Sequence, residues 1–255
     1  MPEENAPTLL SSDSLAPANV APIGLLSCSP RPGGNSDTAA RLFAQGYAAI
    51  AGRDSQTVML REYTVLPCIG CDACRRAIRA PLESDLGPET ALYDQARVKA
   101  LFGQTEDGFG DGLPRFGCPL AAKEHSAPLL NFLAEAPALC LASPIYFYHL
   151  PALLKALLDR TQPFWHLNDM GIDCFRGGER TCHVILIGAR PQGKRLFEGS
   201  LLTLKYALAA LRIKLAEPLL LYGQDQPSAL ADDSRAKRRV LEYAKQAAGK
   251  RHTSG

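Results

Sequence analysis

The stretch that decides the fold covers residues 22–50 and reads PIGLLSCSPRPGGNSDTAARLFAQGYAAI. It begins with a short apolar run, 22–27, which predicts a buried β-strand. A turn rich in Ser, Pro, Gly and Asn follows, and from Ser36 to Ile50 apolar residues recur at helical spacing. Asn35 and Ser36 are suitable N-cap residues for that helix. The stretch therefore predicts a strand, a tight turn and a helix, in that order.

The same alternation continues along the chain. Further apolar runs predict strands at 56–61, 138–142, 181–188 and 217–222, and helical patterns fall at 121–133, 150–160, 196–213 and 232–247. Strands that alternate with helices form a parallel sheet with helices on both faces. Five such strands suit a three-layer, flavodoxin-like α/β fold with the strand order 2-1-3-4-5, which binds its ligand at the carboxyl edge of the sheet.

The chain of 255 residues is long enough for one large domain. We expect this domain to span residues 22–248, between a disordered N-terminal tail at 1–21 and a short C-terminal tail at 249–255. Residues 79–117 interrupt the alternation. Connections of this length are uncommon in compact domains, so we expect an insertion here, after the second strand.

Composition excludes several classes of protein. Hydrophobic residues make up 46% of the chain and charged residues 21%, as in ordinary globular proteins. A net charge of +2 argues against a dedicated nucleic-acid binder. The sequence shows neither an uninterrupted apolar span nor a signal-peptide pattern. We therefore expect a cytoplasmic protein without membrane or nucleic-acid partners, in which closely spaced cysteines indicate metal or redox chemistry.

The turn after the first strand is a candidate phosphate site. Backbone N–H groups at a helix N-terminus favour a bound anion, and Arg31 can add a charge-assisted hydrogen bond. The other polar candidates here are Ser29, Asn35, Ser36, Asp37 and Thr38. An ordinary solvent-exposed turn uses the same residue types, so composition leaves both interpretations open. The pattern matches neither GxxxxGK[ST] nor GxGxxG, which argues against ATP and Rossmann-type dinucleotides.

An aromatic segment follows the third predicted strand. It contains Pro144, Ile145, Tyr146, Phe147 and Tyr148, at the edge where such sheets bind ligands. A planar ring could lie against these side chains. The alternative interpretation is that the aromatic residues belong to the core or to an interface.

Three cysteines, Cys68, Cys71 and Cys74, are separated by two residues each. This spacing lets thiolates converge on one metal centre, as in iron–sulfur proteins. A fourth ligand must come from elsewhere, and Cys118, which precedes a proline, is the candidate. The same thiols could instead hold zinc, form a redox dithiol between Cys68 and Cys71, or be inert.

Together these motifs resemble a known family. They are S-x-R-x-x-x-N-S at 29–36, P-C-I-G-C-D-A-C at 67–74, and S-P-I-Y-F at 143–147 followed by L-x-x-L-x-D-R at 154–160. They resemble the NADPH-dependent FMN reductases and, within them, the iron–sulfur flavoproteins. The resemblance implies FMN with its phosphate in the 29–38 loop and its isoalloxazine ring beside Pro144–Phe147. It also implies a homodimer or homotetramer with flavin sites near subunit boundaries. The family's third flavin loop tends to be glycine-rich, whereas residues 188–193 here read GARPQG, and Arg190 is the candidate to face the flavin.

The leading hypothesis is an FMN-dependent oxidoreductase or electron-transfer flavoprotein with NAD(P)H as the electron donor. A [4Fe–4S] cluster on Cys68, Cys71, Cys74 and Cys118 would exchange electrons with the flavin, and a redox partner protein or a small molecule would accept them. One alternative is an NAD(P)H:quinone or flavin reductase without a cluster. Another is a non-catalytic flavodoxin-like binding module.

Overall fold

The computed structural model describes residues 23–83, 104–105, 108–109, 118–171, 175 and 180–249. The expected N-terminal tail, most of the expected insertion and all but one residue of the expected C-terminal tail lie outside the described residues. No helix in the described ranges is long and apolar enough to cross a bilayer.

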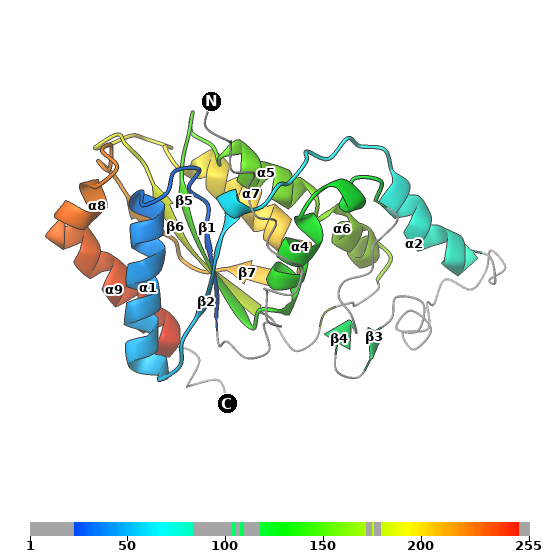
Figure 1. The fold of residues 1–255 in the computed structure, drawn as a ribbon, viewed down its shortest axis with the longest axis horizontal. Helices are drawn as coiled ribbons and strands as arrows, with labels where there is room; N and C mark the ends of the chain where they lie inside the picture. The colour runs from blue at the N-terminus through cyan, green and yellow to red at the C-terminus, as the bar shows by residue number, and fades with distance from the viewer. Residues whose placement is uncertain are drawn as a thin grey trace, which may run out of the picture.

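A parallel sheet forms the centre of the molecule (Figure 1). Its strands are β1 (Gly24–Ser27), β2 (Gln56–Met59), β5 (Ala138–Pro144), β6 (Arg180–Ile187), β7 (Ile213–Leu215) and β8 (Leu219–Leu221). They run in the order β2-β1-β5-β6-β7, and β8 also pairs with β6. Ile213 lies opposite Arg180 and Leu219 opposite Ile185, so β7 and β8 are two segments of one fifth strand. The predicted flavodoxin-like order 2-1-3-4-5 is confirmed.

Helices cover both faces of the sheet (Figure 1). One face carries α1 (Asn35–Ala51), α8 (Ala229–Asp232) and α9 (Ser234–Gly249), and the other carries α4 (Ser126–Glu135), α5 (Ala152–Asp159), α6 (Gln162–Asp169) and α7 (Glu198–Ala209). Each face has its own apolar core. Helices α1 and α9 approach closely at Gly46, where a Cβ atom would lie 2.9 Å from the carbonyl oxygen of Leu241.

Several boundaries differ from the prediction. The long helix expected at 196–213 ends at Ala209, and β7 follows it. The pattern at 121–133 divides into a 3-10 turn, η3 (Ala121–Lys123), and α4, while the closing helix expected at 232–247 is α9, which begins at Ser234. A 3-10 turn, η2 (Leu60–Glu62), ends the second predicted strand early. Three of the described helices were not predicted: the short α8, α6, and α2 (Ala73–Glu83), which packs on α6. The short strands β3 (Gln104–Thr105) and β4 (Gly108–Phe109) pair within the expected insertion.

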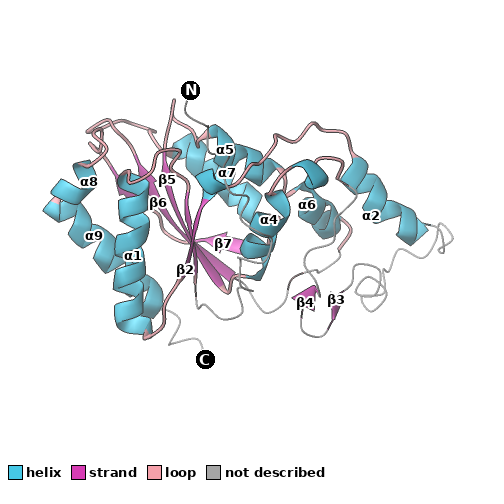
Figure 2. Cartoon of the chain, viewed as in Figure 1, coloured by secondary structure: helices cyan, strands magenta, loops and turns pink. Residues whose placement is uncertain are grey.

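The strand ends place four loops along one edge of the sheet. Ser27 lies opposite Ala142, Pro144 opposite Ile187, and Ile187 opposite Leu221. The loops that follow β1, β5, β6 and β8 therefore all leave the carboxyl edge, which is the upper edge in Figure 2. Two of the motifs singled out in the sequence, at 28–38 and 144–149, lie in these loops.

Candidate functional site

The loop between β1 and α1 is shaped to receive an anion. Gly33 has a left-handed φ of +68°, and extended Gly34 precedes the first turn of α1. No described side chain caps that turn, so its backbone N–H groups remain available to a ligand. Ser29 Oγ accepts the N–H of Arg31 at 3.2 Å and donates to the Arg31 carbonyl at 2.9 Å, which holds the loop in a compact turn.

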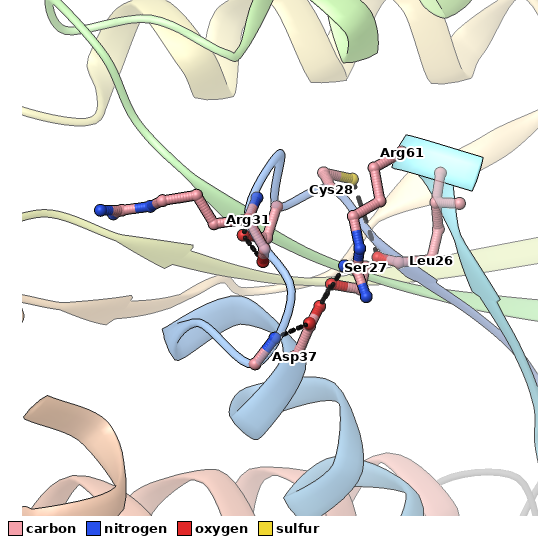
Figure 3. A network of polar contacts seen from close by, with 8 residues as sticks. Leu26, Ser27, Cys28, Arg31, Asp37 and Arg61 are labelled. Carbon is pink, nitrogen blue, oxygen red and sulfur yellow. Dashed lines mark hydrogen bonds and ion pairs between the residues drawn. The ribbon is translucent and has the colours of Figure 1, made fainter. Parts of the chain in front are cut away.

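Charged and polar side chains of this loop have different surroundings. The Arg31 side chain is exposed and extends away from Asp37 (Figure 3). Ser36 and Thr38, in the first turn of α1, are buried. The Asp37 carboxylate accepts hydrogen bonds from Ser27 Oγ, from the N–H of Gly33 at 2.8 Å and from Arg61 Nη1 at 2.9 Å. Asp37 therefore braces the loop from within.

The Asn35 side chain joins the loop to a distant part of the chain. Its Nδ2 donates to the carbonyls of Gln224 at 3.1 Å and Gln226 at 2.8 Å, and its Oδ1 accepts the N–H of Leu230 at 3.0 Å. These three hydrogen bonds occupy the amide, so the structure gives Asn35 a positioning role rather than a place against a ligand.

The aromatic segment forms a tight turn after β5. Tyr146 and His149 exchange backbone hydrogen bonds of 2.8 and 2.9 Å, and between them Phe147 and Tyr148 both have positive φ, 49° and 65°. Two left-handed residues at the centre of a two-residue turn are typical of type I′ geometry, which Asn and Gly normally adopt. Here the turn displays an aromatic pair instead, and Phe147 is fully exposed. Such backbone strain is common at functional sites.

A cavity of about 360 Å³ lies between this turn and the loop after β6. Its lining residues are Ile145, Tyr146, Phe147, Tyr148, Ala189, Arg190 and Leu196. Arg190 Nη1 donates to Tyr148 Oη at 3.0 Å, and the guanidinium also lies 5.5 Å from the centre of the Tyr148 ring. The structure thus brings the predicted residues 145–147 and Arg190 together around one apolar cavity with a cation at its border.

Two polar residues near this edge were missed by sequence reasoning. His149 Nδ1 accepts the N–H of Leu150 at 3.0 Å, which leaves the Nε2 proton for Thr203 Oγ1 at 3.2 Å and fixes the turn on α7. Gln224 donates from Nε2 to the Tyr222 carbonyl and to Asp233, but its buried Oε1 has no hydrogen-bond partner in the part of the chain described. Gln224 belongs to no sequence motif, and His149 ends the aromatic segment without any spacing that marks its role.

The predicted metal ligands lie in two segments. Cys68 and Cys71 are exposed, and Cys74 and Cys118 are half-buried. Burial is the main cause that raises the pKa of the Cys74 thiol above its usual value, and the nearby thiols of Cys68 and Cys118 add to it. Among the described residues, however, no three Cys, His, Asp or Glu side chains are close enough to share a metal ion.

Cys118 accepts a hydrogen bond from one member of a buried ion pair. Arg160 Nη2 lies 2.6 Å from Glu124 Oε1 and donates to Cys118 Sγ at 3.1 Å. Glu124 also accepts hydrogen bonds from the N–H of Leu66 and from Ser126 Oγ, so it links the segment before Cys68 to the segment after Cys118. Arg160 ends the L-x-x-L-x-D-R motif, which is the only sequence signal for this network.

The other described cysteines differ from these four. Cys28, Cys140 and Cys182 are buried within the core, and burial raises the pKa of each thiol far above its usual value. A neutral, inaccessible thiol is neither a nucleophile nor a ready metal ligand. Chemistry at cysteine in the described residues is therefore restricted to the 68–74 segment and Cys118.

Comparison with known proteins agrees with this arrangement. A family model described as NADPH-dependent FMN reductase matches residues 21–178. An iron–sulfur flavoprotein of Methanocaldococcus jannaschii is 26% identical over 140 residues, which cover 54% of this chain and 50% of that protein. The chain thus matches about half the length of this curated relative.

Solved structures share the fold. An azoreductase from Bacillus anthracis superposes with a TM-score of 0.52 at 16% identity and covers 89% of this chain and 98% of its own. An NAD(P)H:quinone oxidoreductase from Methanothermobacter marburgensis gives 0.52 at 18% identity, over 91% of this chain and 96% of its own. The family model covers more than half of the chain and includes the segments 29–36 and 143–147, whereas the loop at 188–193 lies beyond the match. The chain therefore belongs to the NADPH-dependent FMN reductase family.

Proposed function

We propose that this protein is an FMN-dependent oxidoreductase that accepts reducing equivalents from NAD(P)H at the carboxyl edge of its sheet. One observation carries the proposal: the uncapped N-terminus of α1 and the 360 Å³ cavity beside Phe147 open at the same edge. A phosphate suits the first feature and a planar apolar ring suits the second. Membership of the family supports the same cofactor.

The side chains near this edge would bind different parts of FMN. Arg31 and the hydroxyls of Ser29, Ser36 and Thr38 bind the phosphate, together with the N–H groups of the first turn of α1. Pro144, Ile145, Tyr146 and Phe147 border the isoalloxazine ring. Arg190 places a positive charge there, which stabilises an anionic reduced ring. Bound FMN would supply the exchange between two-electron and one-electron chemistry, and the protein supplies its orientation and electrostatics.

We further propose that Cys68, Cys71, Cys74 and Cys118 hold a [4Fe–4S] cluster. Four thiols are the donor set that such a cluster requires. The contacts of Glu124 and Arg160 support a common site, because Glu124 accepts the N–H of Leu66, two residues before Cys68, while its partner Arg160 donates to Cys118 Sγ. The thiols do not converge in the described residues, so cluster binding requires the exposed segment around Cys68 and Cys71 to close over the metal. The name of the Methanocaldococcus relative supports this assignment.

An exposed apolar strip on α7 suggests how the protein assembles. Leu202 and Tyr206 lie four residues apart on α7, and both are exposed. We propose that this apolar strip is covered by a second copy in a homodimer or homotetramer.

The seven described cysteines are all free thiols, which suits the reducing cytoplasm that we propose as the location of the protein. A redox partner protein or a small molecule would accept the electrons.

A second candidate function is an NAD(P)H:quinone or flavin reductase without a cluster. This function needs no converging metal ligands, and none are found as a group of three among the described residues. The visible spectrum of anaerobically purified protein separates the two, because only a cluster adds broad absorption beneath the flavin bands. A colourless protein that does not bind FMN would leave a non-catalytic binding module.

Replacing Arg31 by alanine tests the flavin proposal directly. A charge-assisted hydrogen bond contributes about 1.5–3 kcal/mol, so Arg31→Ala should weaken FMN binding about tenfold to a hundredfold. Riboflavin lacks the phosphate and should bind equally well to both proteins. Titration calorimetry or flavin fluorescence measures both dissociation constants. Arg41→Ala removes an exposed arginine of α1, outside the loop, and serves as the control. Equal losses for FMN and riboflavin would contradict the assignment.

Phe147 offers a test of the ring site. A left-handed conformation costs a non-glycine residue about 1–2 kcal/mol, so Phe147→Gly should leave the melting temperature unchanged or raise it. Flavin fluorescence or the flavin reduction potential should nevertheless change, because the aromatic border is lost. Ile50→Ala, at an exposed apolar position near the end of α1, should change neither property of the flavin. A lower melting temperature with an unaltered flavin would assign Phe147 to the structural framework.

A further inference from the structure

We propose that Arg61 is the counter-charge that makes the loop at 28–34 acceptable to a phosphate: by neutralising Asp37 it preserves the preference for FMN over riboflavin. The inference rests on the proposed flavin site. It concerns a residue outside the loop and outside every motif noted in the sequence. Arg61 is a positioning residue, because it acts on the ligand through Asp37.

The geometry places a carboxylate inside the loop. Asp37 lies in the first turn of α1 and reaches back to the last residue of β1, Ser27, and to the N–H of Gly33 (Figure 3). These two hydrogen bonds fix both ends of the turn, including the left-handed conformation at Gly33. The carboxylate is thus required for the shape of the loop, although its charge is the same sign as that of a phosphate.

Arg61 supplies the opposite charge from a different element of the fold. It belongs to η2, directly after β2, and its Nη1 lies 2.9 Å from Asp37 Oδ1. The side chains of Arg61 and Asp37 are only 18% and 12% exposed, so water screens the pair weakly. Arg31, the other arginine near the loop, extends away from Asp37 (Figure 3). Neutralisation of Asp37 therefore falls to Arg61.

Loss of Arg61 alone would leave Asp37 as an unbalanced negative charge beside the phosphate site. Arg61→Met should therefore weaken FMN binding about tenfold or more, as is typical when one member of a close charge pair is removed. Riboflavin carries no phosphate, so its dissociation constant should change less than about twofold. The FMN defect should shrink at high salt, because salt screens the repulsion.

Removing the second charge should restore binding. In the double variant Asp37→Asn/Arg61→Met, the amide oxygen can still accept the N–H of Gly33, but the repulsive charge is gone. We expect FMN affinity to return to within about threefold of the wild type, which is a large interaction energy in a double-mutant cycle. Arg61→Lys retains the charge and should retain most of the FMN preference. Arg41→Met is the control for loss of an exposed arginine on α1.

The outcomes separate this inference from the flavin proposal. A wild-type protein that binds neither FMN nor riboflavin would overturn both. If the wild type binds both flavins, equal losses for FMN and riboflavin in Arg61→Met would show a merely structural role and overturn the inference alone. Failure of the double variant to recover FMN affinity, with a melting temperature equal to that of the wild type, would also overturn it. If Arg61→Met does not fold, the comparison of Arg61→Lys with Asp37→Asn/Arg61→Met decides the question by the same two dissociation constants.

Discussion

Replacement of Arg160 by methionine is expected to lower the free energy of unfolding by about 3–5 kcal/mol, the usual consequence of breaking a buried ion pair. The side chain of Glu124 is fully buried and that of Arg160 is 5% exposed. Glu124 also accepts hydrogen bonds from Leu66 and Ser126, so it cannot turn toward solvent when its partner is lost. Urea denaturation of the flavin-free protein measures the change.

A matched control lies on α5, the helix that ends at Asp159 immediately before Arg160. Lys155 pairs with Asp159 at 2.7 Å on α5, but both side chains are about two-fifths exposed. Lys155→Met should therefore cost no more than about 1 kcal/mol. Adding Glu124→Gln to Arg160→Met removes the stranded charge and should recover part of the stability. A loss in Arg160→Met no larger than in the control would contradict the buried pair.

Replacement of Cys118 by serine is expected to abolish or degrade the cluster. Anaerobically prepared wild-type protein should contain about four irons and four sulfides per chain, the composition of a [4Fe–4S] cluster. Cys118→Ser removes one of four thiolate ligands, whereas FMN binding should survive because the flavin loops lie at other positions in the chain. Iron and sulfide analysis together with the visible spectrum report both outcomes.

The choice of the fourth ligand has its own control. Cys174→Ser removes the remaining cysteine that is outside the described residues, and it should leave the iron content unchanged. An intact cluster in Cys118→Ser would exclude Cys118 and point to Cys174 or to a ligand other than cysteine. Zinc in place of iron after anaerobic preparation would favour the reductase without a cluster.

The arrangement of the sheet could be predicted because its central strands are short apolar runs that alternate with helical patterns. The region after α7 could not, because Leu211 and Ile213 continue an apolar pattern that suits either a helix or a buried strand. The structure resolves the ambiguity through the left-handed residue Arg212 and the pairing of Ile213 with Arg180. Local periodicity carries no information about such a partner.

The same limit applies to the site. Its loops could be located from the sequence because the carboxyl ends of parallel strands meet at one edge. The partners of individual side chains could not, since Arg61 meets Asp37 across 24 positions of sequence. The left-handed turn at Phe147 and Tyr148 could not be predicted from the sequence either, because bulky residues rarely adopt that conformation.

The three hydrogen bonds of the Asn35 side chain also set the order in which the loop between β1 and α1 can be anchored during synthesis. The most distant of their partners, Leu230, follows Asn35 by 195 positions. At about 5–20 residues per second, a ribosome needs roughly 10–40 seconds to add that length of chain. The first strand and helix emerge early, yet the loop between them gains its bonds to residues 224–230 only after about 190 further residues have been added. The loop between β1 and α1 therefore reaches its final anchored conformation long after its own residues have been synthesised.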